Sequence, residues 1–184
     1  MYHFSKPFPS PNHLSHFAKH IKMDVFKIFF ALICVSGLFL VKPSLAQNSP
    51  KDYLNAHNAA RKMVGVGPLF WDRKLAAYAQ SYANKRMRDC KLVLSGGPYG
   101  ENLAWSSDRS LTGVGAVKLW VSKKGFYNYR SNKCVGDQSC LAYTQVVWRR
   151  SKKLGCARVK CTNGGTFVIC SYSPRGNISS QRPY

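Results

Sequence analysis

The stretch "LGCARVKCTNGGTFVICSYS", residues 154–173, contains two runs in which apolar and polar residues alternate. Alternation with a period of two places the apolar side chains on one face of a β-strand. Between the runs lies Asn163-Gly164-Gly165, a combination that favours the positive φ values of a tight hairpin turn. The stretch therefore predicts a pair of neighbouring antiparallel strands.

Helical patterns precede this hairpin. Ser49 followed by Pro50 predicts a helix start, because a hydroxyl group caps the first turn and proline fits it well. Asp72 and Ser110 give similar starts, each followed by apolar residues at helical spacing. Helices followed by an antiparallel sheet indicate an α+β or layered α-β-α domain. The helices are expected at 50–64, at 72–90, from Ser110 onward and at 139–150.

Residues 1–46 have the pattern of targeting sequence. Lys27 precedes an apolar run at 28–41, and Ser44-Leu45-Ala46 forms a small-residue cleavage site. The apolar run is shorter than the roughly 20 residues of a membrane span. We therefore expect a secretory signal peptide and an extracellular mature chain, located in the apoplast or cell wall. A signal anchor is the alternative. We expect translation to start at Met23, which makes residues 1–22 an N-terminal extension; a start at Met1 with a long basic region before the apolar run is the alternative.

The chain is strongly basic. It has 28 lysine and arginine residues against seven acidic ones, a formal net charge of +21. From residue 47 onward it has 23 basic residues against six acidic ones, so the mature chain keeps +17, and a secreted protein of this charge is expected to associate with anionic surfaces such as pectin-like polysaccharide or microbial membranes. Nucleic acid is excluded as a partner, because the basic residues are spread over every segment and the signal directs the chain out of the cell.

The cysteines indicate disulfides. Cys34 lies in the apolar run of the signal, and an even set remains after it. In an oxidising compartment this set predicts three disulfides, although the sequence alone allows 15 connectivities. The six residues are Cys90, Cys134, Cys140, Cys156, Cys161 and Cys170.

Few candidate catalytic side chains lie after residue 46. His57 is the one histidine of that part, and Glu101 is the one glutamate. Zinc normally takes three or four His, Cys or carboxylate ligands, and a nucleophile of the Ser-His type would have to use His57. His57 falls in the middle of a predicted helix, so we interpret it as a packed, hydrogen-bonded residue. We expect no enzyme, no metal and no cofactor.

Several motifs together resemble the plant pathogenesis-related proteins of class one, a basic form within the CAP superfamily. The resemblance covers residues 48–184 and implies a three-layer α-β-α sandwich with a central antiparallel sheet at 47–173. It also implies the disulfides Cys90–Cys161, Cys134–Cys140 and Cys156–Cys170. The motifs that carry it are "DYLNAHNAAR", "LAAYAQSYA", "YGENLAW", "YTQVVWR", "LGCARVKC" and "CSYSPRGN" followed by the final "PY".

The resemblance also implies a central cleft, which in this family usually holds two histidines and two glutamates that bind divalent metal. The matching positions here are Leu94, Glu101, Lys123 and Ala142, so three of the four have lost the ligand group. One glutamate facing leucine and alanine cannot hold zinc, and Lys123 adds a competing positive charge. We therefore expect a degenerate metal site, with an ion pair between Glu101 and Lys123 as a hypothesis.

Sterol and lipid binding in this family is attributed to a loop before the fourth helix. The matching stretch carries Phe126, Tyr127 and Tyr129, with basic residues on both sides. Aromatic rings beside cations suit an apolar ligand with an anionic headgroup. The alternative is an ordinary loop whose aromatic rings cover the edge of the sheet.

The tail, residues 174–184, resembles a segment that this family releases as a defence-signalling peptide. An extracellular protease would cut after Ser173, in front of Pro174, and a Gly/Pro/Ser-rich end past the last strand favours access. A tail wrapped on the body is the alternative. Asn177 begins an N-glycosylation sequon, and a glycan there would interfere with release.

Two functions from different classes follow. The first is a secreted, non-enzymatic defence-type protein that binds sterol, other lipid, or acidic wall and microbial surfaces. The second is a precursor whose product is the peptide Pro174–Tyr184, with the domain as carrier. A hydrolase is a third and weak alternative, because the mature chain has a single histidine.

Overall fold

The computed structural model describes residues 47–184, so the expected signal segment lies outside the described residues. The predicted hairpin is confirmed as β5 (Lys153–Lys160) and β6 (Thr166–Ser173), which pair antiparallel. β2 (Gly100–Ser106) pairs antiparallel with the other edge of β6, and the short β1 (Phe70–Trp71) adds to β5 in parallel. The strand order is β1-β5-β6-β2.

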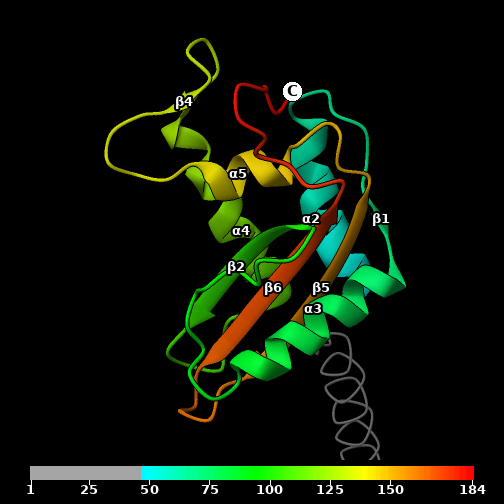
Figure 1. Cartoon of the computed structure of the whole chain (residues 1–184), viewed down its shortest axis with the longest axis vertical. Coiled ribbons are helices and arrows are strands. Elements are labelled where there is room, and N and C mark those ends of the chain that lie inside the picture. Colours follow the sequence, from blue (N-terminus) through cyan, green and yellow to red (C-terminus); the bar gives the residue numbers. More distant parts are fainter. Residues whose placement is uncertain (1–46) are drawn as a thin grey trace, which may run out of the picture. The chain divides into compact units, whose positions relative to one another are not determined.

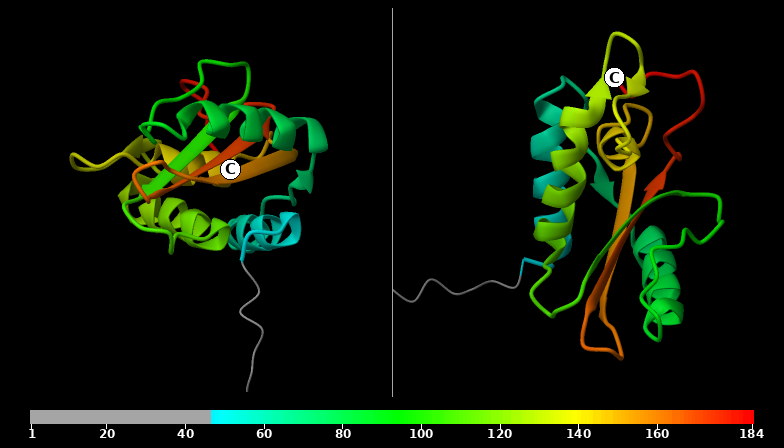
Figure 2. Two further views of the ribbon diagram at one scale, coloured as in Figure 1. Left: turned by 90° about the horizontal axis from the view of Figure 1, so that it is seen from below. Right: turned by 90° about the vertical axis from the view of Figure 1, so that its left-hand side faces the viewer.

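Helices cover both faces of this sheet (Figures 1 and 2). α3 (Arg73–Arg86) packs on one face against β5 and β6, while α2 (Pro50–Lys62) and α4 (Gly113–Ser122) lie side by side on the other. α5 (Leu141–Val146) contacts α4 on the same side. The predicted α-β-α sandwich is confirmed. Within residues 47–184 no helix has the length and hydropathy of a membrane span.

Alternation along β6 divides the interior into two cores. Val168, Cys170 and Tyr172 point into the core shared with α2, α4 and α5. Phe167 and Ile169 point to the opposite side, into the core beneath α3. Every one of these five side chains is fully buried. This strand has apolar residues on both faces because helices cover both.

The first two helices begin where the sequence predicts. The Ser49 hydroxyl accepts a hydrogen bond from the Asp52 N–H, and the Asp52 carboxylate accepts one from the Ser49 N–H, which completes a capping box. The Asp72 carboxylate caps α3 by accepting from the N–H groups of Lys74 and Leu75. Both caps satisfy backbone donors that a helix start leaves free.

The later two helices differ from the prediction at their ends. α4 begins at Gly113 with Thr112 as its cap, because the Ser110 hydroxyl instead donates to the Asp108 carboxylate at 2.6 Å. α5 stops at Val146, well before residue 150. At its carbonyl end the buried guanidinium of Arg61 donates a hydrogen bond to the Val146 carbonyl at 3.0 Å.

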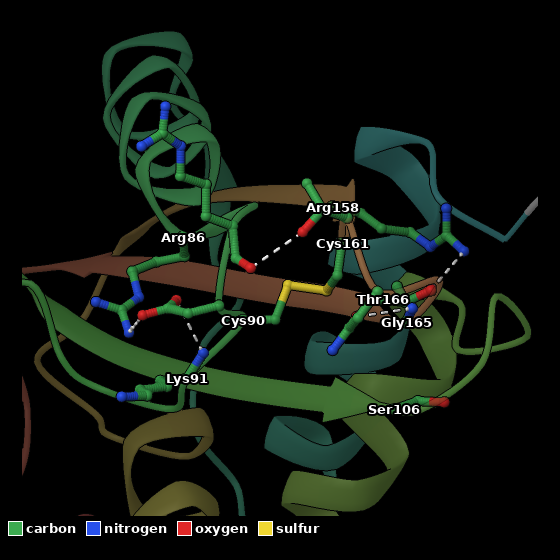
Figure 3. Close-up of a disulfide and its surroundings, with 12 residues drawn as sticks. Arg86, Cys90, Lys91, Ser106, Arg158, Cys161, Gly165 and Thr166 are labelled. Carbon is green, nitrogen blue, oxygen red and sulfur yellow. Dashed lines mark hydrogen bonds and ion pairs between the residues drawn. A yellow bond between two sulfur atoms is a disulfide. The ribbon is translucent and has the colours of Figure 1, made fainter.

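The three disulfides join the pairs that the family resemblance implies. Cys90–Cys161 ties the end of α3 to the turn of the β5–β6 hairpin (Figure 3). Cys156–Cys170 links directly opposite positions of β5 and β6. Cys134–Cys140 closes the segment between β4 (Lys133–Cys134) and α5. β4 pairs with β3 (Tyr127–Asn128) in a small separate ribbon.

Candidate functional site

Three of the four predicted cleft positions lie in one cavity. Leu94, Glu101 and Ala142 line a space of about 520 Å³, together with Arg175 and Asn177 of the tail. Leu94 is 60% exposed, so the wall at this position is an accessible apolar surface. The fold therefore brings these three predicted positions together around one cavity.

Lys123 does not line this cavity. It follows α4 and opens the 3-10 helix η1 (Lys123–Phe126), whose course places its ammonium group 5.3 Å from the centroid of the Phe126 ring. The ion pairs found among residues 47–184 are Arg86–Asp89 and Lys153–Asp72. The predicted ion pair between Glu101 and Lys123 is therefore wrong.

Glu101 is instead bound by the loop that precedes β2. The Ser95 N–H donates to Glu101 Oε2 at 2.7 Å, and the Ser95 hydroxyl donates to Glu101 Oε1. The Tyr78 hydroxyl lies within 2.5 Å of the same serine oxygen. No group of three His, Cys, Asp or Glu side chains is placed for a metal ion anywhere in residues 47–184. The carboxylate already has two donors and no further ligands beside it.

His57 lies in the core and is fully buried. Its Nδ1 is 2.7 Å from the Tyr53 carbonyl, which can only accept, so this nitrogen carries the proton. The Tyr172 hydroxyl then donates to Nε2 at 2.8 Å. Burial lowers the pKa of His57 to about 4. Both nitrogens are engaged and shielded from any substrate, so the geometry agrees with a packed, structural histidine.

The three aromatic side chains of the predicted lipid loop differ in their surroundings. Phe126 contacts Lys123 at the end of η1. Tyr127 is partly buried, and its ring packs against Tyr143 of α5 at a centroid distance of 6.2 Å. Tyr129 is 48% exposed. The loop thus presents one exposed ring, while Tyr127 belongs to the edge of the core.

The tail follows β6 and wraps over α5. The carbonyls on either side of the predicted cleavage point are hydrogen-bonded, since Lys152 N–H donates to Ser173 at 2.9 Å and the Ser151 hydroxyl donates to Pro174 at 2.7 Å. Further along, Asn177 Nδ2 donates to the Leu141 carbonyl. Its Oδ1 accepts from the hydroxyl of Thr144. A protease and a glycosyl group would therefore both compete with native hydrogen bonds.

A second cavity, which sequence reasoning missed, lies between α2 and α4. Its volume is about 550 Å³, and its lining is mainly apolar. In the sequence, small and branched residues recur at helical spacing on both helices. Only the structure shows that the two helices pack side by side, so that the faces carrying these residues meet. The lining includes Ala56, Ala59, Ala60, Val114, Val117 and Val121, with Gln47, Asp52 and Lys118 among its polar residues.

Residues 54–172 match the model of the cysteine-rich secretory protein family, abbreviated CAP. Among relatives, pathogenesis-related protein 1 of Arabidopsis thaliana is 56% identical over 157 residues, which is 85% of this chain and 93% of that protein. The basic form of pathogenesis-related protein 1 of Nicotiana tabacum is 59% identical over 150 residues, 82% of this chain and 84% of its own length.

The fold has counterparts among solved structures. Venom allergen-like protein 4 of Schistosoma mansoni superposes with a TM-score of 0.59 at 28% sequence identity, covering 73% of this chain and 92% of that chain. The sandwich is therefore shared beyond plants.

Proposed function

This chain belongs to the cysteine-rich secretory protein family, CAP, and from that premise we propose that it is a secreted, non-enzymatic defence-type protein that binds sterol or another apolar lipid. The plant relatives named as pathogenesis-related support the defence role. The buried His57 and the doubly bound Glu101 support a role without catalysis, because neither offers a free base to a substrate.

The cavity between α2 and α4 is the observation that carries lipid binding. A volume of about 550 Å³ lies within the range of small-molecule sites, and alanine and valine side chains suit a hydrocarbon. The cavity reaches Ser122, which directly precedes the basic residues and Phe126 of η1. An apolar chain in the cavity would therefore have its polar end close to Lys118 and the predicted lipid loop.

The positive charge supports a second contact, with an anionic surface. Residues 47–184 carry a formal net charge of +17, so the mature chain is attracted to acidic wall polysaccharide and to microbial membranes over roughly a Debye length, about 8 Å at physiological salt. This attraction brings the protein to the surface, while the cavity provides selectivity for an apolar molecule.

Titration of the disulfide-intact mature protein with a fluorescent sterol tests the proposal. Ala59→Trp places an indole in the mouth of the cavity and is expected to weaken binding at least about tenfold. Ala77→Trp is the matched control, since Ala77 is an exposed alanine on α3 outside the cavity. Equal binding by both variants rejects the cavity as the site.

A companion pair of variants tests the loop. Phe126→Ala with Tyr127→Ala removes two of its rings, but Tyr127 also packs on the core. Phe126→Ala with Tyr129→Ala therefore gives the cleaner measurement. Unchanged sterol affinity in both pairs excludes the loop as a contact and leaves the cavity on its own.

The alternative function is a precursor of the peptide Pro174–Tyr184, cut after Ser173 by an extracellular protease. The exposure of Pro174, Arg175 and residues 178–180 favours it, since this stretch lies outside the sheet. Mass spectrometry of extracellular fluid tests this alternative by searching for the free peptide. Finding only the intact chain would leave lipid binding as the function.

A further inference from the structure

The last part of the tail, Gln181–Tyr184, binds to a face made largely of tyrosine side chains. We call this face the tyrosine face; it consists of Tyr127, Tyr129, Tyr143 and the backbone of residues 130 and 149. We propose that the tyrosine face is a peptide-binding surface that recognises an Arg-Pro-Tyr segment, and that it holds this segment as a ligand independently of the intact chain upstream.

Tyr184 supplies the aromatic part of the recognition. Its ring stacks on Tyr129 with centroids 5.1 Å apart and an interplanar angle of 18°. It meets the ring of Tyr127 edge-on at 6.1 Å, and its hydroxyl lies 3.3 Å from that of Tyr143. The Tyr184 ring thus makes a stacked and an edge-on contact with two tyrosine rings, and its hydroxyl reaches a third tyrosine.

Arg182 supplies the charged part. Its guanidinium carbon lies 4.9 Å from the centroid of the Tyr129 ring, within the range of a cation–π contact. The same group donates hydrogen bonds to the carbonyls of Tyr129 and Arg130. A planar guanidinium can make a ring contact and a forked hydrogen bond together, whereas a lysine ammonium cannot.

Backbone contacts fix the register of the segment. The Asn132 side chain donates to the Gln181 carbonyl at 3.1 Å, and the Arg149 N–H donates to the Pro183 carbonyl at 2.7 Å. Pro183 itself is buried. Proline restricts the segment before it binds, so less conformational entropy is lost on docking.

The segment is a separate unit, because the residues before it make few contacts. Asn177 is anchored to α5, but Ile178, Ser179 and Ser180 are all exposed. Beneath this span lies a small cavity of about 170 Å³, lined by tail residues on one side and by Leu141, Thr144 and Trp148 on the other. The tail is therefore bound at Asn177 and again from Gln181 onward, while residues 178–180 between them are exposed.

Cleavage of the backbone before Gln181 would leave the segment bound at the tyrosine face. Hydrolysis of the backbone would remove the tether but none of the contacts at the tyrosine face. The segment would then leave by dissociation, and a second copy of the same segment could take its place. The inference concerns the tyrosine face alone and does not depend on lipid binding in the α2–α4 cavity.

Binding in trans tests the inference. The mature protein with Arg182→Ala and Tyr184→Ala has an unoccupied tyrosine face, and the probe is a fluorescein-labelled peptide Ser-Ser-Gln-Arg-Pro-Tyr. We expect fluorescence anisotropy to show binding at least about tenfold tighter for this variant than for the wild type, whose own tether supplies a competing tail at an effective concentration of about 1 mM. The matched peptide with alanine at the arginine and tyrosine positions is expected not to bind.

Two controls make the result decisive. Adding Tyr129→Ala to the variant removes the ring that both Arg182 and Tyr184 contact, so it should abolish binding of the probe. Tyr184→Ala alone serves as a milder variant if the double substitution disturbs folding, which thermal unfolding will show. Equal binding by variant and wild type, no binding by either, or binding that survives Tyr129→Ala would overturn the inference.

Discussion

Arg61 and Arg182 use the same chemistry in two very different places. Each donates hydrogen bonds to backbone carbonyls, and neither forms an ion pair among the described residues. Arg61 is fully buried and joins α2 to the end of α5, while Arg182 is exposed on the tyrosine face. Burial therefore decides whether such an arginine stabilises the fold or binds a replaceable segment.

The buried Arg61 also donates to more carbonyls than Arg182 does. Arg61 donates to four carbonyls, those of Gly67, Val146, Trp148 and Ser151. Desolvation lowers its pKa to about 10, so the guanidinium remains charged at neutral pH. The carbonyls of Val146, Trp148 and Ser151 accept these hydrogen bonds in the buried interior, whereas Gly67 lies at the surface. At the tyrosine face, Arg182 and Tyr129 are both accessible, so solvent can replace the hydrogen bonds that Arg182 donates.

The largest expected effect is that of Arg61→Leu. This change leaves two buried carbonyls, those of Val146 and Ser151, without a donor and removes a second donor from the Trp148 carbonyl, and we expect a loss of about 4 kcal/mol in the free energy of unfolding. Guanidinium unfolding with intact disulfides measures it. Arg182→Leu is the matched control, for which we expect less than about 1 kcal/mol. Similar losses in the two variants would contradict the contrast between buried and exposed arginine.

The second prediction concerns acid. The pKa of His57 falls from 6.5 to about 4 on folding. Between these pH values His57 is therefore protonated in the unfolded chain but neutral in the native core. Stability is therefore complete above pH 6.5 and is lost as the pH falls towards 4, by on the order of 3 kcal/mol. Chemical unfolding between pH 7 and 4 measures this loss, and His57→Gln should remove this part of it.

The tyrosine face gives the opposite expectation over the same pH range. Among the described residues, its recognition contacts involve tyrosine, arginine and asparagine side chains and backbone groups, and no histidine takes part. Binding of the Ser-Ser-Gln-Arg-Pro-Tyr probe should therefore change less than about twofold over this interval, provided that the domain stays folded. A pH-dependence of probe binding that follows the loss of stability would mean that the two regions are coupled.

The sequence predicts the parts of this protein that depend on local patterns. The alternation in 154–173 gives the hairpin, and the Ser49 and Asp72 caps give two helix starts, because each signal lies within a few residues of the structure it causes. The disulfide pairing and the cleft positions came through the family resemblance, since spacing alone leaves every connectivity open.

The remaining features depend on contacts between distant residues. Lys123 aligns with a cleft position, yet the start of η1 turns it towards Phe126. The α2–α4 cavity requires two helix faces to meet. The residues of β2 alternate in burial, but apolar and polar residue types do not alternate regularly along it, so its sequence does not predict a strand. The docking of Tyr184 on Tyr129 joins positions 55 residues apart, so no local pattern could have predicted it.

The fourth prediction addresses the disulfide beside the tyrosine face. Cys134–Cys140 closes a short loop between β4 and α5, with a sequence separation of 6. Replacing both residues with serine should cost about 2 kcal/mol, because the loop entropy of the unfolded chain is regained. It should also weaken probe binding to the Arg182→Ala/Tyr184→Ala protein, since β3 and β4 position Tyr127 and Tyr129. Full stability with unchanged probe binding would show that the ribbon positions neither ring.

The smallest expected effect is that of Tyr184→Ala, and it separates the two regions most sharply. Loss of one stacked and one edge-on ring contact should lower the free energy of unfolding by only about 1 kcal/mol. Hydrogen exchange should nevertheless rise at the Arg149 N–H, which donates to the Pro183 carbonyl, and stay unchanged around His57. Ile178→Ala, at an exposed tail residue, is the matched control and should change neither. Faster exchange around His57 in the Tyr184→Ala protein would show that the segment is part of the folding core, and that the tyrosine face cannot exchange its ligand without opening the domain.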